Sequence, residues 1–255
     1  MRKYILIHII LALLYVPHAV WLYAKPEEAE PVVHKVALED LILALNNGVR
    51  KQHGLKPLQY EGRLREVARH HSTDMIRRKF FDHKNPDGLS PADRIAGGHR
   101  TLIGTSGENI WQIQSQKTYT TRALAKQSMV NWMASPGHRA NILNPGYTHL
   151  GVGVSMVRGN VTITQNFSGT AAYLDQALPK EIKRGEHLNF TMTSFGSFKL
   201  NAEYYEYWHE HKNERKSESI PIDNRQVNIK KGKYRLWFYF REKNSLWPGP
   251  VVEVR

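Results

Sequence analysis

Apolar residues recur every three or four positions in several stretches of the first part of the chain, which is the spacing of one face of a helix. Two of these helices also have a start signal, because Ser90 and Ser135 each stand directly before a proline. Serine is a favoured N-cap, and proline suits the first helical position. The predicted helices cover residues 38–53, a stretch after Gly62, a short segment from Ser90, residues 121–133 and a turn from Ser135 to Ile142.

Apolar and polar residues alternate in two neighbouring stretches, Gly151–Met156 and Val161–Phe167. This period is typical of β-strands with one buried face. Gly159 and Asn160 between them predict a tight hairpin turn that starts with glycine. Residues 80–90, by contrast, contain a run of turn-forming residues and are predicted to form a loop.

From about Leu178 the pattern changes to short extended stretches without helices. The polar stretch His209–Ser219 predicts a charged loop. The remaining stretches predict a small all-β, sandwich-like unit. Its predicted strands cover residues 188–192, 198–207, 226–229, 234–240 and 251–254. Helices followed by strands in this order place the whole chain in the α+β class.

The N-terminus has the pattern of an export signal. Two basic residues precede an apolar run from Tyr4 to Val16, and small residues follow at Ala19 and Ala24. This order is typical of a signal peptide, and the run is shorter than the roughly 20 apolar residues of a membrane span. An apolar stretch extended to Leu22 makes an uncleaved anchor the alternative. We therefore predict a secreted or periplasmic protein, or one held near a membrane by its N-terminus.

Charge and composition limit the kinds of partner that this protein is expected to bind. The chain has 255 residues and a formal net charge of +13, and it has no cysteine, so no disulfide can stabilise it. Basic residues are spread along the sequence rather than gathered in a stripe with stacking aromatics, which disfavours a nucleic-acid partner. Anionic polymers or lipids of the cell envelope, or simply a solvated basic surface, fit this distribution better.

Three short polar islands carry the candidate chemistry. They are Phe81–His83, Gly107–Asn109 and Ser135–Leu143, and they contribute His83, Glu108 and His138. Two imidazoles and a carboxylate match the three protein ligands of a catalytic zinc site. Their separations of 25 and 30 residues (108 − 83 and 138 − 108) carry no local signal. A buried Glu108 that accepts backbone amides and a packing His138 are the alternative.

The residues beside the islands suggest how the islands are held. Gly107 allows a close approach of the backbone or a positive φ before Glu108. Asn141 follows His138 by about one helical turn and is able to orient it or to hold the next loop. We expect Asn141 to belong to the same site.

Over residues 38–169 the sequence resembles the CAP superfamily (cysteine-rich secretory, antigen 5 and pathogenesis-related 1 proteins) in its bacterial, cysteine-free form. The ordered motifs that carry the resemblance are Asn47–Arg50, Gly54–Leu58, Phe80–His83, Gly88–Arg94, Gly107–Asn109, Trp132–Leu143, Gly151–Val154 and Thr164–Phe167.

The resemblance implies a three-layer α-β-α sandwich with a central cleft. That cleft holds two histidines and two glutamates, and some members bind zinc or another divalent ion there. By motif, His83, Glu108 and His138 occupy three of the four positions, and all three are the implied metal ligands. Ser135 stands where the second glutamate is expected, so the tetrad is incomplete. The predicted cleft set is His83, Glu108, Ser135, His138 and Asn141.

The domain limits follow from the resemblance and the N-terminal pattern. We predict a signal peptide or anchor over residues 1–24, a leader over 25–37, a CAP-like domain over 38–172 and a C-terminal all-β domain over 178–255.

Three functions are compatible with this sequence. The first is an exported, non-enzymatic protein that binds a ligand or divalent ion in its cleft, with a β unit that contacts the cell envelope or a partner. The second is a metal-assisted hydrolase, peptidase-like, with zinc-bound water and Glu108 as ligand or base. The third is lipid or sterol binding. His83, Glu108 and His138 are the catalytic candidates of the second hypothesis, and the sequence leaves enzymatic activity open.

Overall fold

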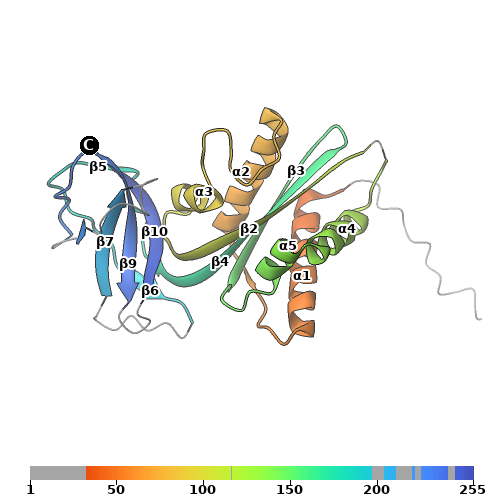
Figure 1. The fold of residues 1–255 in the computed structure, drawn as a ribbon, viewed down its shortest axis with the longest axis horizontal. Coiled ribbons are helices and arrows are strands. Elements are labelled where there is room, and N and C mark those ends of the chain that lie inside the picture. Colours follow the sequence, from red (N-terminus) through yellow and green to blue (C-terminus); the bar gives the residue numbers. More distant parts are fainter. Residues whose placement is uncertain (1–32, 116, 197–203, 211–219, 222–224, 241–244) are drawn as a thin grey trace, which may run out of the picture. The chain divides into compact units, whose positions relative to one another are not determined.

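The computed structural model describes residues 33–115, 117–196, 204–210, 220–221, 225–240 and 245–255 (Figure 1). The predicted N-terminal signal or anchor lies outside these residues. Within them, no helix has both the length and the apolar character needed to cross a membrane.

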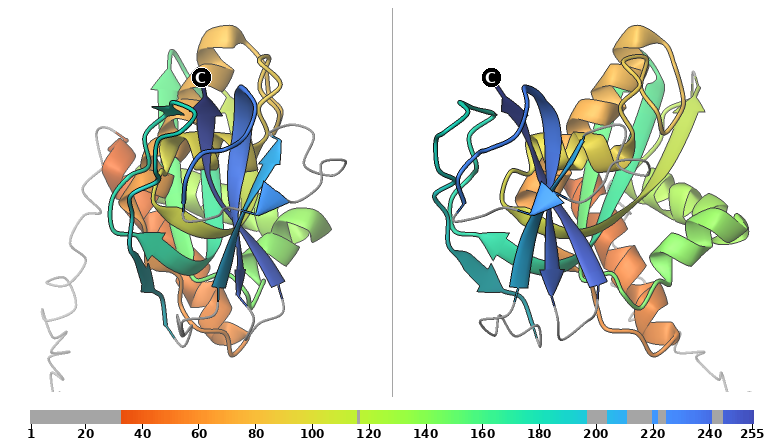
Figure 2. Two further views of the ribbon diagram at one scale, coloured as in Figure 1. Left: turned by 90° about the vertical axis from the view of Figure 1, so that its left-hand side faces the viewer. Right: turned by 60° about the vertical axis from the view of Figure 1, so that its left-hand side comes forward.

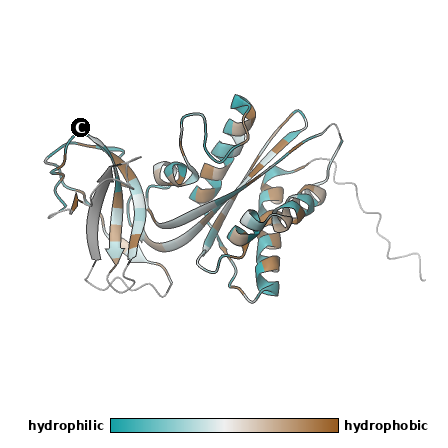
Figure 3. Ribbon diagram, viewed as in Figure 1, coloured by the Kyte–Doolittle hydropathy of each residue, from teal (hydrophilic) through white to brown (hydrophobic). Residues whose placement is uncertain are grey.

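The predicted helices are present. They are α1 (Lys35–Gln52), α2 (Gly62–Arg78), α3 (Pro91–Gly98), α4 (Thr121–Ala134) and α5 (Pro136–Ile142). Helices α1 and α2 carry hydrophobic and hydrophilic positions side by side (Figure 3). Their apolar faces are buried, as at Leu38 and Ile42 in α1 and at Leu64 and Ala68 in α2.

The two predicted serine caps differ. Ser90 forms a full capping box with Asp93 at the start of α3. Ser135 precedes Pro136 as expected, but its side chain makes no capping hydrogen bond. That part of the prediction was wrong, since Ser135 is the single residue between α4 and α5 and its N–H closes the end of α4 on the carbonyl of Trp132.

A mixed sheet forms the middle layer of the first part of the chain. Its order is β1 (Gln59–Tyr60), β3 (His149–Val157), β4 (Asn160–Leu174) and β2 (Leu102–Gln114), and β6 (Met192–Ser194) also pairs with β4. Helices α2 and α3 cover one face, and α1, α4 and α5 cover the other (Figures 1 and 2). The predicted three-layer α-β-α sandwich is therefore confirmed.

Close packing of α2 on the sheet depends on glycine. A Cβ added to Gly153 would lie 2.1 Å from the backbone nitrogen of Arg69 in α2. Only glycine allows this approach, which brings the polar residues of α2 close to the middle of the sheet.

The hairpin between β3 and β4 has a different turn from the predicted one. Val157 pairs with Asn160, so the two turn residues are Arg158 and Gly159. Both have positive φ, 47° and 78°. This is the geometry of a turn with two left-handed residues, which matches the twist of the strands better than a turn centred on Gly159 and Asn160.

The C-terminal part contains the predicted small β unit. Its sheet has the order β5 (Glu181–Ile182), β10 (Ser245–Val254), β9 (Gly232–Phe240), β7 (Tyr204–Glu210) and β8 (Ile220–Pro221). The predicted strands at 234–240 and 251–254 are present, and the one at 198–207 appears in its described part as β7. His209 and Glu210 belong to β7, and the rest of the predicted charged loop lies outside the described residues.

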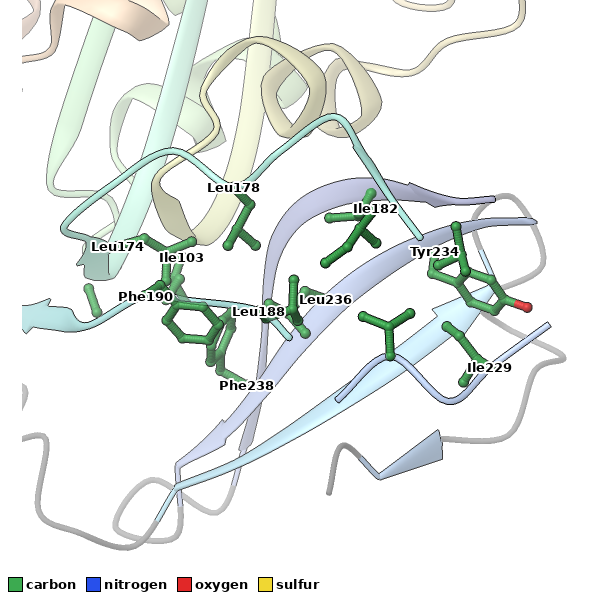
Figure 4. Packing of buried hydrophobic residues seen from close by; sticks show 14 of the residues in the cluster. Ile103, Leu174, Leu178, Ile182, Leu188, Phe190, Ile229, Tyr234, Leu236 and Phe238 are labelled. Atoms are coloured by element: carbon green, nitrogen blue, oxygen red, sulfur yellow. The ribbon is translucent and has the colours of Figure 1, made fainter. Parts of the chain in front are cut away.

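Two other predicted strands were wrong in extent. Of residues 188–192 only Met192 is in a strand, and residues 226–229 form no strand beyond an isolated bridge between Gln226 and His187. Their apolar side chains fill the core instead of pairing in a ladder. Leu188, Phe190 and Ile229 belong to one buried cluster (Figure 4). Val227 belongs to the same cluster.

This cluster also joins the two parts of the chain. Ile103 and Leu174 of the first sheet pack in it together with Leu236 and Phe238 of β9 (Figure 4). Polar contacts accompany the packing, since Arg235 of β9 lies 3.0 Å from Asp93 of α3. The predicted domain limits, 38–172 and 178–255, stay predictions.

Candidate functional site

Glu108 is the centre of the site. It lies in β2, a strand that the sequence analysis did not predict, and its side chain is 1% exposed. Oε1 lies 2.8 Å from Nδ1 of His83, and Oε2 lies 2.6 Å from Nη2 of Arg94. Asn166, with its amide oriented to satisfy both ends, donates to Oε2 at 3.2 Å. Both carboxylate oxygens are therefore engaged by side chains rather than by the backbone amides that the alternative prediction had expected.

Arg94 holds the loop that carries His83. Its Nη1 donates to the backbone carbonyls of His83 at 2.7 Å and of Leu89 at 2.8 Å. The capping box of α3 fixes the first turn of that helix, and Arg94 follows it directly. The arginine side chain is only 9% exposed. One guanidinium group thus neutralises Glu108 and fixes the loop of residues 81–89 above it.

His71 of α2 is the third group beside Glu108. It is buried, and its Nε2 lies 3.1 Å from the carbonyl of Asp82 and 3.8 Å from Oε1 of Glu108. Burial lowers the pKa of His71, against the opposing attraction of Glu108. We therefore treat His71 as a neutral imidazole that donates from Nε2 to Asp82, rather than as the cation of an ion pair.

His138 enters from the opposite layer, on α5. Its ring centroid lies 6.5 Å from that of His83, with the rings tilted by 50°. Burial is the main cause that lowers the pKa of His138, and the charge of His83 acts in the same direction. His83 has a side chain that is 47% exposed, so this pair of imidazoles is the part of the site that solvent reaches.

The third island is tied to the second through asparagine. Asn141 donates to the backbone carbonyl of Glu108 at 3.1 Å and to Oδ1 of Asn109 at 2.9 Å. Asn109 in turn donates to the carbonyl of His138 at 3.1 Å. Gly107 is required for close approach rather than for a positive φ, because a Cβ there would lie 2.2 Å from the hydroxyl of Tyr147.

The structure thus brings together four of the five predicted cleft residues. His83 contacts Glu108, His138 lies beside His83, and Asn141 holds the strand of Glu108. Ser135 lies at the start of α5 and, in the described part of the chain, makes no side-chain hydrogen bond with any of them.

A metal ion at the predicted site would require three ligand atoms whose lone pairs are free. In the described ranges no group of three histidine, cysteine, aspartate or glutamate side chains is arranged to hold a metal ion. Both oxygens of Glu108 already face N–H donors, one of them the cationic Arg94. As they lie, the residues do not fit a three-ligand zinc site, and metal binding stays a prediction.

Three residues around Glu108 were missed by the sequence analysis as site residues, His71, Arg94 and Asn166. His71 lies on the apolar face of a predicted helix, which favours a packing histidine. Arg94 lies in one of the motifs that carry the resemblance, four residues after Ser90, and that position near the start of a helix was the only available signal.

Comparison with known proteins agrees with this architecture. Residues 43–167 match the family model described as CAP, cysteine-rich secretory protein family. Two relatives come from Bacillus subtilis. "Uncharacterized protein YkwD" is 40% identical over 133 residues, which cover 52% of this chain and 48% of that protein. "Uncharacterized membrane protein YlbC" is 38% identical over 129 residues, which cover 51% of this chain and 34% of that protein.

Among solved structures, an extracellular protein containing an SCP domain from Bacillus anthracis is 31% identical, with a TM-score of 0.44, over 52% of this chain and 41% of that chain. This chain therefore matches half or less of the length of each of these relatives. The match of the family model and the α-β-α architecture together identify residues 43–167 as a bacterial-type, cysteine-free CAP domain.

Proposed function

We propose that this protein is an exported binding protein whose CAP domain receives a polar ligand between His83 and His138, while the C-terminal β unit contacts the cell envelope or a partner. The observation that carries the proposal is the engagement of both oxygens of Glu108, by His83 and by Arg94. Glu108 is then a fixed anchor, and the imidazoles are the groups that meet the ligand.

This geometry favours binding over hydrolysis. A general base must reach the proton that it removes, directly or through one water. Glu108 is 1% exposed and both of its oxygens are occupied by side-chain donors, so a substrate does not reach it. His83, in contrast, is oriented by Glu108 through Nδ1, so Nε2 is the ring nitrogen that Glu108 does not use, and the side chain is 47% exposed.

Charge supports an anionic partner outside the cell. The net charge of +13 attracts polyanions over a distance set by salt, and envelope polymers are polyanions that an exported protein meets. Export itself rests on the N-terminal pattern of residues 1–24.

A divalent ion is a second proposal for the same cleft, with zinc alone as its probe. The carboxylate that holds Nδ1 of His83 is the kind of outer partner that metal-binding histidines use. With two imidazoles and no free carboxylate, we expect binding that is weak and dependent on His138.

The main test separates binding from cleavage. The full chain is mixed with sedimented bacterial envelope material and, separately, with a mixture of fluorogenic peptides. We expect co-sedimentation that falls several-fold in the double variant His83→Ala/His138→Ala, with His70→Ala, an exposed histidine of α2, as the matched control. Cleavage of the peptides that is lost in the double variant would overturn the proposal in favour of the hydrolase.

A further inference from the structure

Strand β2 has an unshared edge. The order of the sheet places it last, and in the described part of the chain it pairs with β4 alone. An edge strand exposes a row of N–H and C=O groups that can pair with another extended chain. β2 spans 13 residues, so its edge is long enough for such pairing.

One portion of this edge is closed by side chains from the α4 and α5 layer. Trp132 donates from Nε1 to the carbonyl of Ile110 at 3.0 Å, and Asn141 donates to the carbonyl of Glu108 at 3.1 Å. The carbonyls of residues 108 and 110 therefore point away from β4. Odd-numbered residues point the other way: the N–H of Ser115 donates to the carbonyl of Gly159, on the side of β4, at 3.1 Å.

The same alternation places the N–H and C=O groups of Gln112 and Gln114 on the outer edge. Both residues are exposed, and among the residues that the structure describes no side chain hydrogen-bonds to this portion as Trp132 and Asn141 do to the neighbouring one. The open portion is thus directly next to the segment that carries Glu108.

A pocket of about 430 Å³ lies beside this open portion. The side chains of Gln112 and Gln114 share the face of β2 on which Glu108 meets His83, because side chains alternate along a strand. Phe81, 48% exposed, contributes an apolar wall. Met75 and Ile76 of α2 add further apolar lining, and Lys79 is the one charged residue among those that line the pocket.

We infer that an extended polypeptide segment binds by adding a strand to β2 at Gln112 and Gln114. Backbone pairing supplies the hydrogen bonds, and alternate side chains supply specificity, which is how peptides add to sheet edges. One apolar side chain of the segment enters the pocket, and an acidic neighbour meets Lys79. The segment then continues toward His83 and His138, so the inference rests on the proposed function and names polypeptide as the ligand of its cleft.

The test selects nine-residue peptides from a random display library against the full chain and measures their affinity by fluorescence anisotropy. Gln112→Pro removes one outward N–H and no ladder bond, which an edge strand tolerates, and Gln112→Ala is the matched control. We expect about ten-fold weaker binding to Gln112→Pro, the worth of about one hydrogen bond, and little change with Gln112→Ala. Lys79→Glu weakens the acidic peptides among them.

A second readout does not depend on the fold of a variant. Peptides N-methylated at the alternate positions that face β2 lose affinity for the wild type, whereas methylation at the other positions has little effect. Failure to select any peptide, or selected peptides that ignore both Gln112→Pro and the methylation pattern, overturns the inference. Peptides whose affinity depends on His83 and His138 but not on Gln112 overturn the inference and leave the proposed cleft in place. If peptide affinity depends on Gln112 but the full chain does not bind envelope material, the strand addition stands and the proposed function fails.

Discussion

Two buried glutamates, Glu39 and Glu108, are each paired with arginine and yet do different things. Glu39 of α1 has a fully buried side chain, accepts from Nε of Arg69 at 2.8 Å and from the N–H of Val154 at 3.0 Å, and lies 3.6 Å from Arg65. Its partners belong to α2 and β3. It ties α1 to both of them.

Glu108 is equally buried, but only one of its oxygens serves the scaffold. Arg94 takes Oε2, and Oε1 holds His83, whose side chain is 47% exposed. The difference lies in one partner. The partner held by Glu108 is an imidazole that lies beside a second one, His138, whereas Arg69, whose side chain is 40% exposed, joins α2 to α1.

The largest expected effect is on the Glu39 side of the comparison. Glu39→Ala leaves the guanidinium group of Arg69 and the N–H of Val154 without their acceptor, and it removes the carboxylate that lies 3.6 Å from the largely buried Arg65. Breaking such a buried pair costs about 3–5 kcal/mol. Urea unfolding measures this loss. Asp40→Ala, which removes an exposed carboxylate from the same Arg65, is the control and should change stability little. A similar loss in both variants would contradict the structural role of Glu39.

Arg94→Met tests the Glu108 side. It removes the cationic donor of a buried carboxylate and one donor from each of two loop carbonyls, for which we expect a loss of about 2–3 kcal/mol in the free energy of unfolding.

The double variant Arg94→Met/Glu108→Gln should recover part of that loss, since it removes the unpaired charge. Hydrogen exchange in residues 81–89 should also accelerate in Arg94→Met, because the loop loses its two anchors. Unchanged exchange there would show that Arg94 does not fix the loop.

We expect acid to lower the free energy of unfolding through His149, a histidine outside the candidate site. Burial lowers the pKa of His149, with Glu61 opposing and His99 adding to the shift. The unfolded chain then binds a proton more readily than the folded one, so stability is full above the ordinary histidine value of about 6.5 and falls as the pH drops toward the lowered value. Urea unfolding from pH 7.5 to 5.5 measures the slope, and His149→Gln should reduce it. An identical slope in that variant would exclude His149 as a source.

The smallest expected effect on stability comes from the partner that distinguishes the two glutamates. His83→Ala removes a half-exposed side chain together with its hydrogen bond to Oε1 of Glu108, and it should cost about 1 kcal/mol. Envelope binding should nevertheless fall in the same variant. A variant that loses more than about 2 kcal/mol would place His83 in the scaffold, like the partners of Glu39.

The sequence predicted the helices and the β3–β4 pair because their apolar residues follow one period. Strand β2 was not predicted because residues 108–111 are buried on both faces of the sheet, so apolar and polar positions do not alternate there. Its polar Glu108 and Asn109 are compatible with burial only through partners from other elements.

The candidate site was predictable in part. The motifs located His83, Glu108 and His138, whereas pairing of Glu108 with Arg94 depends on how α3 packs against β2. No spacing in the sequence encodes that contact. The same holds for His71, whose place beside Glu108 follows from the close approach of α2 to Gly151 and Gly153.

The tautomer of His83 tests the central claim most directly. An ionised carboxylate only accepts hydrogen bonds, so Nδ1 of His83 must carry the proton that points to Oε1 of Glu108. Nitrogen-15 NMR of the imidazole, at a pH where it is neutral, distinguishes the two forms. We predict the Nδ1–H tautomer in the wild type and its loss in Glu108→Ala. An Nε2–H tautomer in the wild type would contradict the account, because Glu108 would then not be the anchor of His83.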